Sequence, residues 1–192
     1  YGDTDPELTY TNGNGVNNEV PSFTGKLSRE AGEDVGDYGI QQNTVALADN
    51  EESGFKAGNY VIAYTPNKLT ISANGTLTVA GTSYEGTYDG ESHGDAATTN
   101  VTEGTKISYS TDGGETWRTE VPTVTDVSEI TVNVKAENPN YVTATGSYTL
   151  KVNPATITVT AEAKAKTYGD TDPELTYTNG NGVNNEVPSF TG

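Results

Sequence analysis

Cysteine and methionine are both absent from the 192 residues, and positive charge is scarce. Without cysteine there can be no disulfide, thiolate metal site or cysteine nucleophile. The absence of methionine predicts that the sequence is an internal piece of a longer chain. The 10 Lys and Arg face 27 Asp and Glu, which gives a formal net charge of −17. Such a surface repels phosphate backbones and anionic lipids, so we expect no nucleic-acid partner.

Long apolar runs are also missing. No run approaches the roughly 20 residues that a helix needs to cross a bilayer, and no segment has the pattern of a signal peptide, so we expect no membrane insertion. The composition is only 32% hydrophobic with 22 Gly, which resembles a disordered chain. However, the 12 Tyr and the many Val, Ile and Thr favour pleated strands, and no segment keeps a 3.6-residue period. The prediction is an all-β fold.

The two ends of the sequence are identical. YGDTDPELTYTNGNGVNNEVPSFTG begins at Tyr1 and returns without substitution at Tyr168, so that one period runs from Tyr1 to Thr167. A period of this kind is typical of tandem arrays, in which structural units follow one another along the chain.

A diverged repeat lies inside that period. LTISANGTLTV (69–79) resembles LKVNPATITV (150–159), and each pattern predicts a last strand, a join of two or three residues and a first strand. The flanks agree: Thr76 to Tyr88 and Thr156 to Tyr168 are both 12 residues, and each ends at a Tyr followed by Asp and Gly in either order. Two diverged domains of one design therefore alternate.

These spacings place domain boundaries near Asn74/Gly75 and Pro154/Ala155. Residues 1–74 form one domain that lacks its own first strand, and residues 75–154 form a second domain. Residues 155–192 supply the first strand and the N-terminal part of another copy, and are too few to bury an adequate core alone. The register predicts one full period, residues 1–167, that is cut in mid-domain and followed by an overlap at residues 168–192.

Each domain has the pattern of several short, half-buried strands. In EITVNVKA (129–136) and TITVTA (156–161), apolar and polar residues alternate, and pairs such as Asp89-Gly90 and Asp112-Gly113 predict turns between strands. Short strands with frequent turns favour tandem antiparallel β-sandwiches of the Ig-like type. DVGDY (34–38) has the spacing of a tyrosine corner, or of a Gly-bearing turn before a strand. A β-grasp-like fold is the alternative for residues 1–74.

Three motifs carry a resemblance to a known family. AKTYGDTDPELTYT (165–178), LSREAGEDVGDYGI (27–40) and NYVIAYTPNKLTIS (59–72) resemble the MBG domains of the YGX type, which occur as tandem repeats in bacterial surface proteins and large adhesins. YEGTYDGESHG (84–94), ISYSTDGGETW (107–117) and GSYTLKV (146–152) resemble the Tyr-Asp-Gly-type Ig-like repeats found beside them. The resemblance implies a secreted or wall-anchored protein with a stalk-like role, and it supplies no catalytic residues.

One motif predicts a structural hairpin. STDGGETW fits the Asp-box pattern of sialidases and other β-propellers, where it stabilises a hairpin without performing chemistry. We expect the carboxylate of Asp112 to accept hydrogen bonds from turn amides and the ring of Trp117 to pack beneath the hairpin. The pattern residues are Ser110, Asp112, Gly114, Thr116 and Trp117.

Alternating carboxylates are candidate ligands for Ca²⁺. They recur in the two copies of DTDPE, as Asp3, Asp5 and Glu7, and as Asp170, Asp172 and Glu174. A calcium site requires six or more oxygens, and the sequence does not identify the others. The alternative is a solvated Asx-type turn at Pro6. No other cofactor is expected.

Catalysis is not expected. His93 is the single histidine and must be the centre of any Ser-His-Asp triad, but it lies in a Gly-rich turn where exposure is expected. Paired acids for glycoside hydrolysis are compatible with the composition, but small sandwiches with short loops offer no deep cleft. We interpret the chain as a non-enzymatic protein.

The leading hypothesis is a stalk or spacer segment of a secreted or cell-wall-anchored bacterial surface protein, located outside the cell and projecting a distal binding region. The alternative is an adhesive module that binds host glycan or protein through exposed aromatics, namely Tyr84, Tyr88, Tyr109, Trp117 and Tyr141. Expected partners are the neighbouring repeats of the same chain. A strand like residues 155–166 of another molecule could also complete the N-terminal domain head to tail.

Overall fold

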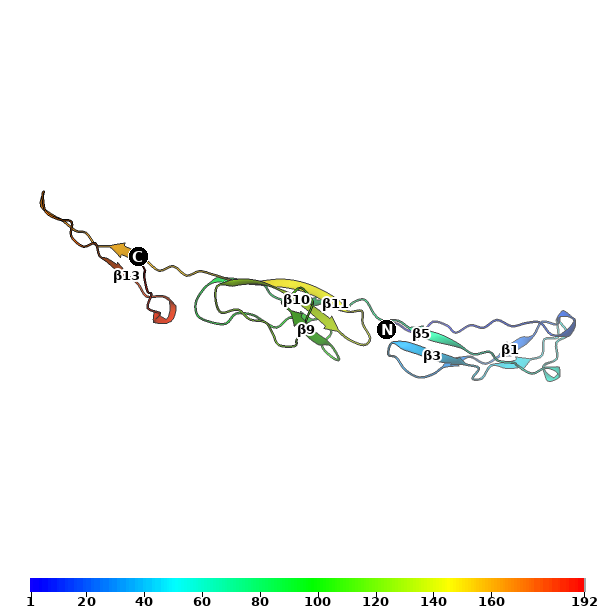
Figure 1. The fold of residues 1–192 in the computed structure, drawn as a ribbon. Helices are drawn as coiled ribbons and strands as arrows, with labels where there is room; N and C mark the ends of the chain where they lie inside the picture. Colours follow the sequence, from blue (N-terminus) through cyan, green and yellow to red (C-terminus); the bar gives the residue numbers. More distant parts are fainter. Residues whose placement is uncertain (192) are drawn as a thin grey trace. The chain divides into compact units, whose positions relative to one another are not determined.

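The computed structural model describes residues 1–191, which form short strands and three single-turn 3₁₀ helices (Figure 1). No α-helix is present among these residues, and none of their helices is long and apolar enough to cross a membrane. The all-β prediction is confirmed, and the helix that a β-grasp fold would need is not seen in the described part. The 3₁₀ helices are η1 (Val16–Asn18), η2 (Ala57–Asn59) and η3 (Val183–Asn185).

The chain divides into two compact units. Unit 1 comprises Tyr1–Thr76 with Asn138–Val142, and unit 2 comprises Leu77–Glu137 with the chain from Thr143 on. This division does not separate residues 155–192 as a third part, so the domain boundaries inferred from the spacing stay a prediction.

Unit 1 contains two small antiparallel sheets. One pairs β1 (Ser22–Thr24) with β4 (Ala46–Ala48), and the other has the order β2-β3-β5. Its core is sparse, because only Val45 and Phe55 are buried among its hydrophobic residues. The bounds of the second sheet are Ser28–Arg29 for β2, Gly36–Gln41 for β3 and Asn67–Ile71 for β5.

The tyrosine-corner spacing in unit 1 yields the hydrogen bond of that motif. Tyr38 stands in β3, and its hydroxyl donates to the carbonyl oxygen of Asp34 at 2.8 Å. The Tyr hydroxyl of a tyrosine corner bonds in the same way to the backbone a few residues upstream. This bond fixes the turn that leads into β3.

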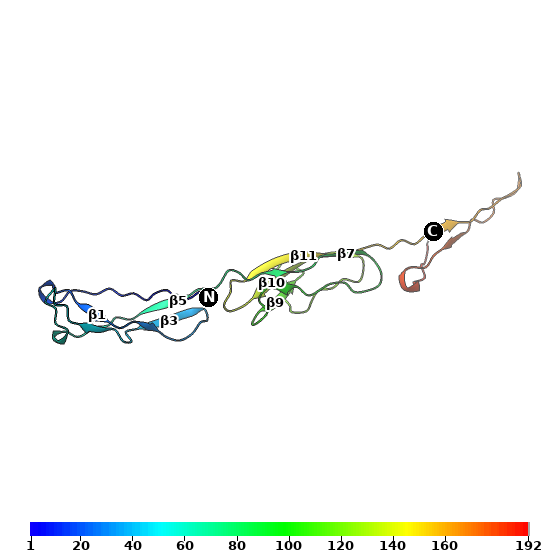
Figure 2. The same ribbon diagram turned by 180° about the vertical axis from the view of Figure 1, so that it is seen from behind.

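Unit 2 is a two-layer arrangement with a continuous core. A four-stranded sheet of order β7-β11-β10-β9 packs against the pair β6-β8, and only β7 and β11 run parallel (Figure 2). Two successive strands therefore belong to different sheets: β6 pairs with β8, and β7 pairs with β11. The bounds are β6 (Val79–Ala80), β7 (Tyr84–Thr87), β8 (Thr98–Thr99), β9 (Lys106–Ser110), β10 (Ser128–Glu137) and β11 (Ala144–Asn153).

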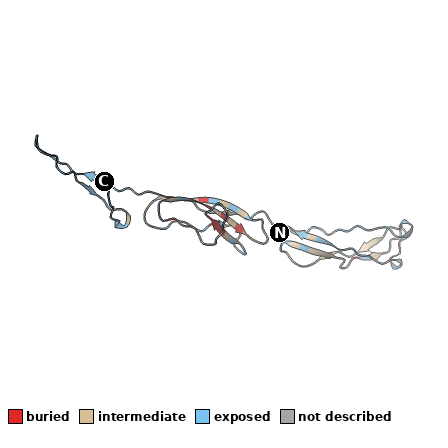
Figure 3. Ribbon diagram, viewed as in Figure 1, coloured by how far each residue is buried: buried red, intermediate tan, exposed pale blue. Residues whose placement is uncertain are grey.

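The alternation in β10 is the local cause of this core. Val132, Val134 and Ala136 are 0% exposed, while the residues between them are at least partly exposed. Figure 3 shows the buried residues on β9, β10 and β11. Side chains of a strand point alternately to its two faces, so the apolar set forms one buried face, as predicted.

The same alternation fails in the tail. β12 (Val159–Ala161) pairs with β13 (Tyr177–Asn179), and every residue of both strands is exposed. Ile157 and Val159, predicted to be half-buried, are 40% and 48% exposed. The prediction was wrong here because a two-stranded ribbon has no second layer against which an apolar face can pack.

The two domain types share their strand register. In unit 2, β6 pairs Val79 with Thr99 and Ala80 with Thr98. In the tail, β12 pairs Val159 with Asn179 and Thr160 with Thr178. The second set of pairs follows the first at one constant offset along the chain, which is also the offset between Thr76 and Thr156. The correspondence inferred from the spacing of those two threonines therefore appears in the backbone pairing.

The joins are longer than the predicted two or three residues. Residues 72–78 separate β5 from β6, and residues 154–158 separate β11 from β12.

Candidate functional site

The Asp-box segment forms a closed hairpin in unit 2. Tyr109, in β9, and Arg118 exchange backbone hydrogen bonds of 2.7 and 2.9 Å, which close the hairpin around residues 110–117. Gly113 and Gly114 have φ of +78° and +98°, a conformation that L side chains rarely adopt. The turn therefore needs glycine at both positions.

Asp112 organises the inside of this turn. The hydroxyl of Ser110 donates to its carboxylate at 2.6 Å, and the backbone N–H of Thr116 donates to it at 3.0 Å. Donors around a carboxylate favour its charged form, so the Ser110 hydroxyl, followed by the Thr116 groups, holds the pKa of Asp112 well below its ordinary value. The carboxylate of Asp112 therefore accepts hydrogen bonds from its own turn.

The side chain of Trp117 is hydrogen-bonded to the backbone of the same turn. Its indole Nε1–H donates to the carbonyl oxygen of Gly114 at 3.0 Å, and the ammonium of Lys135 lies 4.8 Å from the ring centroid. The cation contributes about 0.5–1 kcal/mol at such a partly exposed position. Because Trp117 is the single tryptophan of the sequence, its fluorescence reports on this hairpin alone.

Replacing Asp112 by Ala is expected to lower the melting temperature of unit 2 by several degrees, because it removes the acceptor that the turn donors share. Wild type and variant should begin to converge as the pH falls below about 3.8, the ordinary pKa. The sign follows from the lowered pKa: the stabilisation is present above the ordinary pKa and is lost as the pH falls through the folded one. Thermal unfolding followed by Trp117 fluorescence between pH 2 and 7 measures both effects.

The matched control is Glu115→Ala, which removes one carboxylate from the exposed part of the same turn. An equal loss of stability in the two variants would show that charge, rather than the hydrogen bonds of Asp112, stabilises the hairpin.

The calcium candidates do not converge. Asp5 is bound by Arg29, whose Nε and Nη2 lie 2.6 and 3.1 Å from the two carboxylate oxygens. In the second copy, Asp172 pairs with Lys166 at 2.6 Å. Among residues 1–191, no group of three acidic or histidine side chains is placed to hold a metal ion, so the structure does not assemble Asp3, Asp5 and Glu7, or Asp170, Asp172 and Glu174, into a site.

Arg29 is a residue that the sequence reasoning missed. Its side chain is 10% exposed, it donates to Asp5, to Glu33 and to the carbonyl oxygens of Glu30 and Gly32, and it lies 5.1 Å from the ring centroid of Tyr38. The Arg29 guanidinium holds the pKa of Asp5 below its usual range. The scarcity of cations beside 27 acids was the only signal for this ion pair, and no local spacing connects Arg29 to Asp5.

His93 is half-buried, and the prediction of an exposed turn was wrong. Its ring stacks on Tyr84 at a centroid distance of 4.0 Å, and its Nε2 lies 3.0 Å from Asp89. Its backbone pairs with Val124 in an isolated bridge. These contacts explain why the side chain of His93 is half-buried, and they fix its ring against Tyr84 within unit 2.

The aromatics proposed for ligand contact are mostly engaged within the protein. Tyr109 is 4% exposed and its hydroxyl accepts from the N–H of Ala97 at 2.9 Å, so its expected exposure was wrong. Tyr88 donates to Glu186 at 2.9 Å, and Tyr141 packs edge-on against Tyr1 at 5.4 Å.

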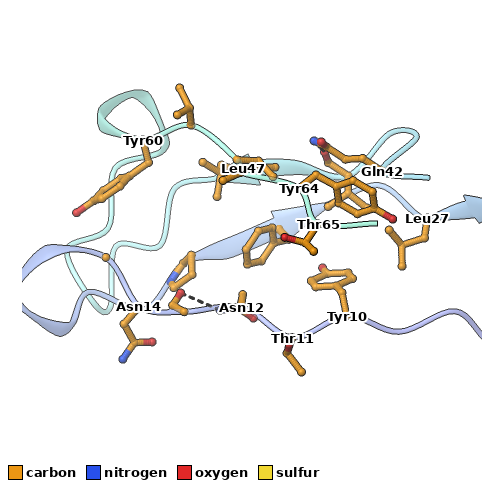
Figure 4. Close-up of a pocket in the computed structure, with 18 of the residues that line it drawn as sticks. Tyr10, Thr11, Asn12, Asn14, Leu27, Gln42, Leu47, Tyr60, Tyr64 and Thr65 are labelled. Atoms are coloured by element: carbon orange, nitrogen blue, oxygen red, sulfur yellow. Dashed lines mark hydrogen bonds between the residues drawn. The ribbon is translucent and has the colours of Figure 1, made fainter. Parts of the chain in front are cut away.

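A groove lies in unit 1, with a volume of about 1030 Å³ (Figure 4). Its two walls are residues 9–16 and 60–67, and Tyr10, Phe23 and Phe55 contribute rings to its lining. None of the lining residues is charged. We call this feature the unit-1 groove.

The hairpin, the shared register and the small antiparallel sheets define the class: an all-β protein built from repeated units. A family model described as "MBG domain (YGX type)" matches residues 1–70 and 157–191, more than half of the sequence. The chain belongs to the MBG domain family of the YGX type. The searches of curated proteins and of solved structures found no match. The resemblance of residues 75–154 to Tyr-Asp-Gly-type repeats stays a prediction.

Proposed function

We propose that the chain is a spacer segment of a bacterial surface repeat protein, secreted or anchored to the cell wall, which holds a distal binding region away from the cell. The observation that carries the proposal is the repetition of one register, Val79 with Thr99 and Val159 with Asn179, together with membership of the MBG family. A spacer tolerates the unchanged duplication of residues 1–25 at 168–192, whereas binding faces that had diversified would differ between copies.

The contacts of the polar groups also favour a structural role. Asp5, Asp37 and Asp49 are each paired with a cation or a backbone donor of unit 1, and Asp112 serves its own turn. His93 contacts Asp89 and Tyr84 rather than a nucleophile. We propose that the chain has no enzymatic activity and that its carboxylates stabilise turns and strand ends.

The proposal is tested by solution scattering from arrays of one, two and three periods, where one period is the sequence from Tyr1 to Thr167. A spacer predicts a maximum dimension that rises by the same increment with each added period. Arrays that fold into one compact particle, or that give the scattering profile of a random coil, would contradict the proposal.

The adhesive alternative has less support from the aromatics. Of the five residues named for it, Tyr109 is buried and Tyr84 is stacked on His93. Tyr88, Trp117 and Tyr141 are partly exposed and are the remaining candidates for contact with glycan or protein. A glycan array probed with the intact chain and with Trp117→Ala separates the two functions, since a spacer binds no glycan in either form.

A further inference from the structure

The first strand of the four-stranded sheet of unit 2 pairs with the last. Along the chain this sheet begins with β7 and ends with β11, and the two strands lie side by side (Figure 2). They run parallel, with Tyr84 aligned with Leu150 and Thr87 with Asn153. Among residues 1–191 every other pair of strands is antiparallel. The two strands nearest the ends of this sheet's chain segment are therefore in direct contact.

The parallel direction determines how this pair responds to tension. In a parallel pair, the start of one strand and the end of the other lie at opposite ends of the paired segment. Tension on the chain before Tyr84 and after Asn153 therefore pulls β7 and β11 past each other along their length, and it acts on all their hydrogen bonds together. An antiparallel pair pulled at the same two points would open from one end, one bond at a time. The β7–β11 pair thus has the geometry that resists tension.

Hydrogen bonds at both ends of β7 extend this contact. The backbone N–H of Tyr88 donates to the carbonyl oxygen of Asn153 at 2.8 Å. The backbone N–H of Thr149 donates to the hydroxyl of Ser83 at 3.1 Å. The contact with β11 therefore reaches one residue beyond β7 on each side.

The side chain of Glu85 is a second link between the two strands. Its carboxylate accepts a hydrogen bond from the amide of Asn153 at 3.1 Å and lies 3.4 Å from the ammonium of Lys151. The same ammonium lies 3.6 Å from the carboxylate of Glu129 in β10. Glu85, Lys151 and Glu129 are aligned in register across three strands, so their side chains lie on one face of the sheet.

β7 is also held by the core of unit 2. The ring of Tyr84 packs against the core residues and stacks on His93 at a centroid distance of 4.0 Å. Its neighbours in β11, Leu150 and Val152, are 0% and 3% exposed. Sliding of β7 along β11 moves Tyr84 off this core and exposes apolar surface to water, which adds to the resistance.

We propose that unit 2 has a further function, the bearing of tension, and that the parallel β7–β11 pair is the clamp that keeps the unit folded when its ends are pulled apart. The biological use of this clamp rests on the proposed spacer function, since a segment that holds a binding region away from the cell is pulled whenever the bound partner moves away. The contact of β11 with β10 runs from Ser128 with Val152 to Ala136 with Ala144 and is longer. The shorter β7–β11 contact therefore breaks first and sets the unfolding rate under force.

Single-molecule pulling of the full chain along two axes tests the proposal. The sequence contains no cysteine, so two introduced cysteines define the points of attachment. Gly75→Cys with Pro154→Cys gives the shear axis, and complete unfolding between these points releases roughly 260–280 Å of extended chain. Glu91→Cys with Pro154→Cys places both attachments beyond the same end of the β7–β11 pair, so that the same bonds open one at a time. A Cβ at Gly75 has no neighbouring atom within 4 Å, and Glu91 and Pro154 are exposed.

We expect unit 2 to unfold at least about tenfold more slowly along the shear axis than along the other axis at the same constant force, a ratio that corresponds to about 1.4 kcal/mol in the barrier. Thr82→Cys with Pro154→Cys applies the force directly before β7 and leaves β6 without tension. This pair should unfold as slowly as the pair that includes Gly75→Cys. The fluorescence of Trp117 verifies that each variant is folded before it is pulled.

Two matched substitutions test the link through Lys151. Glu85→Ala should speed unfolding along the shear axis about two- to fivefold, the effect of losing a partly exposed ion pair. Glu129→Ala removes the other carboxylate partner of the same lysine, which belongs to β10, and should leave the rate close to that of wild type.

Equal unfolding rates along the two axes overturn the proposal, as does faster unfolding along the shear axis. Fast unfolding of the pair with Thr82→Cys would assign the resistance to β6, and equal effects of Glu85→Ala and Glu129→Ala would show that the link between β7 and β11 does not set the rate; either result also overturns it. The scattering test of the spacer function applies no force. Arrays that lengthen in equal steps, while both axes unfold at one rate, therefore contradict the clamp alone.

Discussion

Replacing Phe55 by Ala is expected to unfold unit 1 or to reduce its free energy of unfolding by about 3–5 kcal/mol, the cost of removing a buried aromatic side chain. Phe55 is 2% exposed, pairs with Asn50 in an antiparallel bridge and stacks on Tyr60 at a centroid distance of 4.8 Å. The loss is large because Val45 is the only other buried hydrophobic residue of unit 1, so few core contacts remain when the ring of Phe55 is removed. Chemical denaturation followed by near-UV circular dichroism and amide exchange measures it.

Phe55 also positions one wall of the unit-1 groove. The hydroxyl of Tyr60 accepts from the N–H of Val16 at 2.9 Å and donates to Glu19 at 2.8 Å, so loss of the stacked ring frees both contacts. The control is Val61→Ala, which truncates a side chain that is 93% exposed in the same unit and should leave its stability within about 0.5 kcal/mol of wild type. Equal effects of the two substitutions would show that Phe55 is not the centre of the core.

Replacing Leu150 by Ala is expected to destabilise unit 2 by about 3 kcal/mol, since truncation of a buried leucine costs about 2–5 kcal/mol. Leu150 is 0% exposed and lies in β11 between Ile130 of β10 and Tyr84 of β7. For a domain of this size the loss corresponds to a fall in melting temperature of roughly 10–20 °C. Trp117 fluorescence and differential scanning calorimetry follow the transition of unit 2.

The companion variant Val127→Ala truncates an apolar residue of unit 2 that is 53% exposed, and it should change the melting temperature little. A fall of less than about 3 °C for Leu150→Ala would indicate that the core closes around the cavity and that β11 is not its centre.

The local sequence pattern correctly predicted those parts of the fold whose structure depends on residues close together in the sequence. The alternation of Val132, Val134 and Ala136 gave a buried face, and the Asp-box spacing gave the contacts of Asp112 with its own turn. In both cases the interacting groups are a few residues apart or are repeated along a strand.

Other features depend on residues that are distant in the sequence. Ile157 and Val159 have the same alternation as β10, but a strand buries its apolar face only where a second layer covers it. Asp5 was a candidate calcium ligand because of its neighbours, yet its partner is Arg29, 24 residues away. Tyr109 and His93 are covered by packing that no motif near them encodes.

The unit-1 groove combines both kinds of information. The duplication of residues 1–25 at 168–192 indicated that the same structural unit recurs along the chain. The walls and the uncharged lining became visible only when residues 9–16 and 60–67 were brought together by the fold.

The proposed spacer function is tested most directly by small-angle X-ray scattering from monomeric arrays of one, two and three periods, each running from Tyr1 to Thr167. We predict a maximum dimension that increases by an equal step with each period and a cross-section that stays constant. A dimension that grows with the cube root of the mass, or the scattering profile of a random coil, would contradict the spacer function.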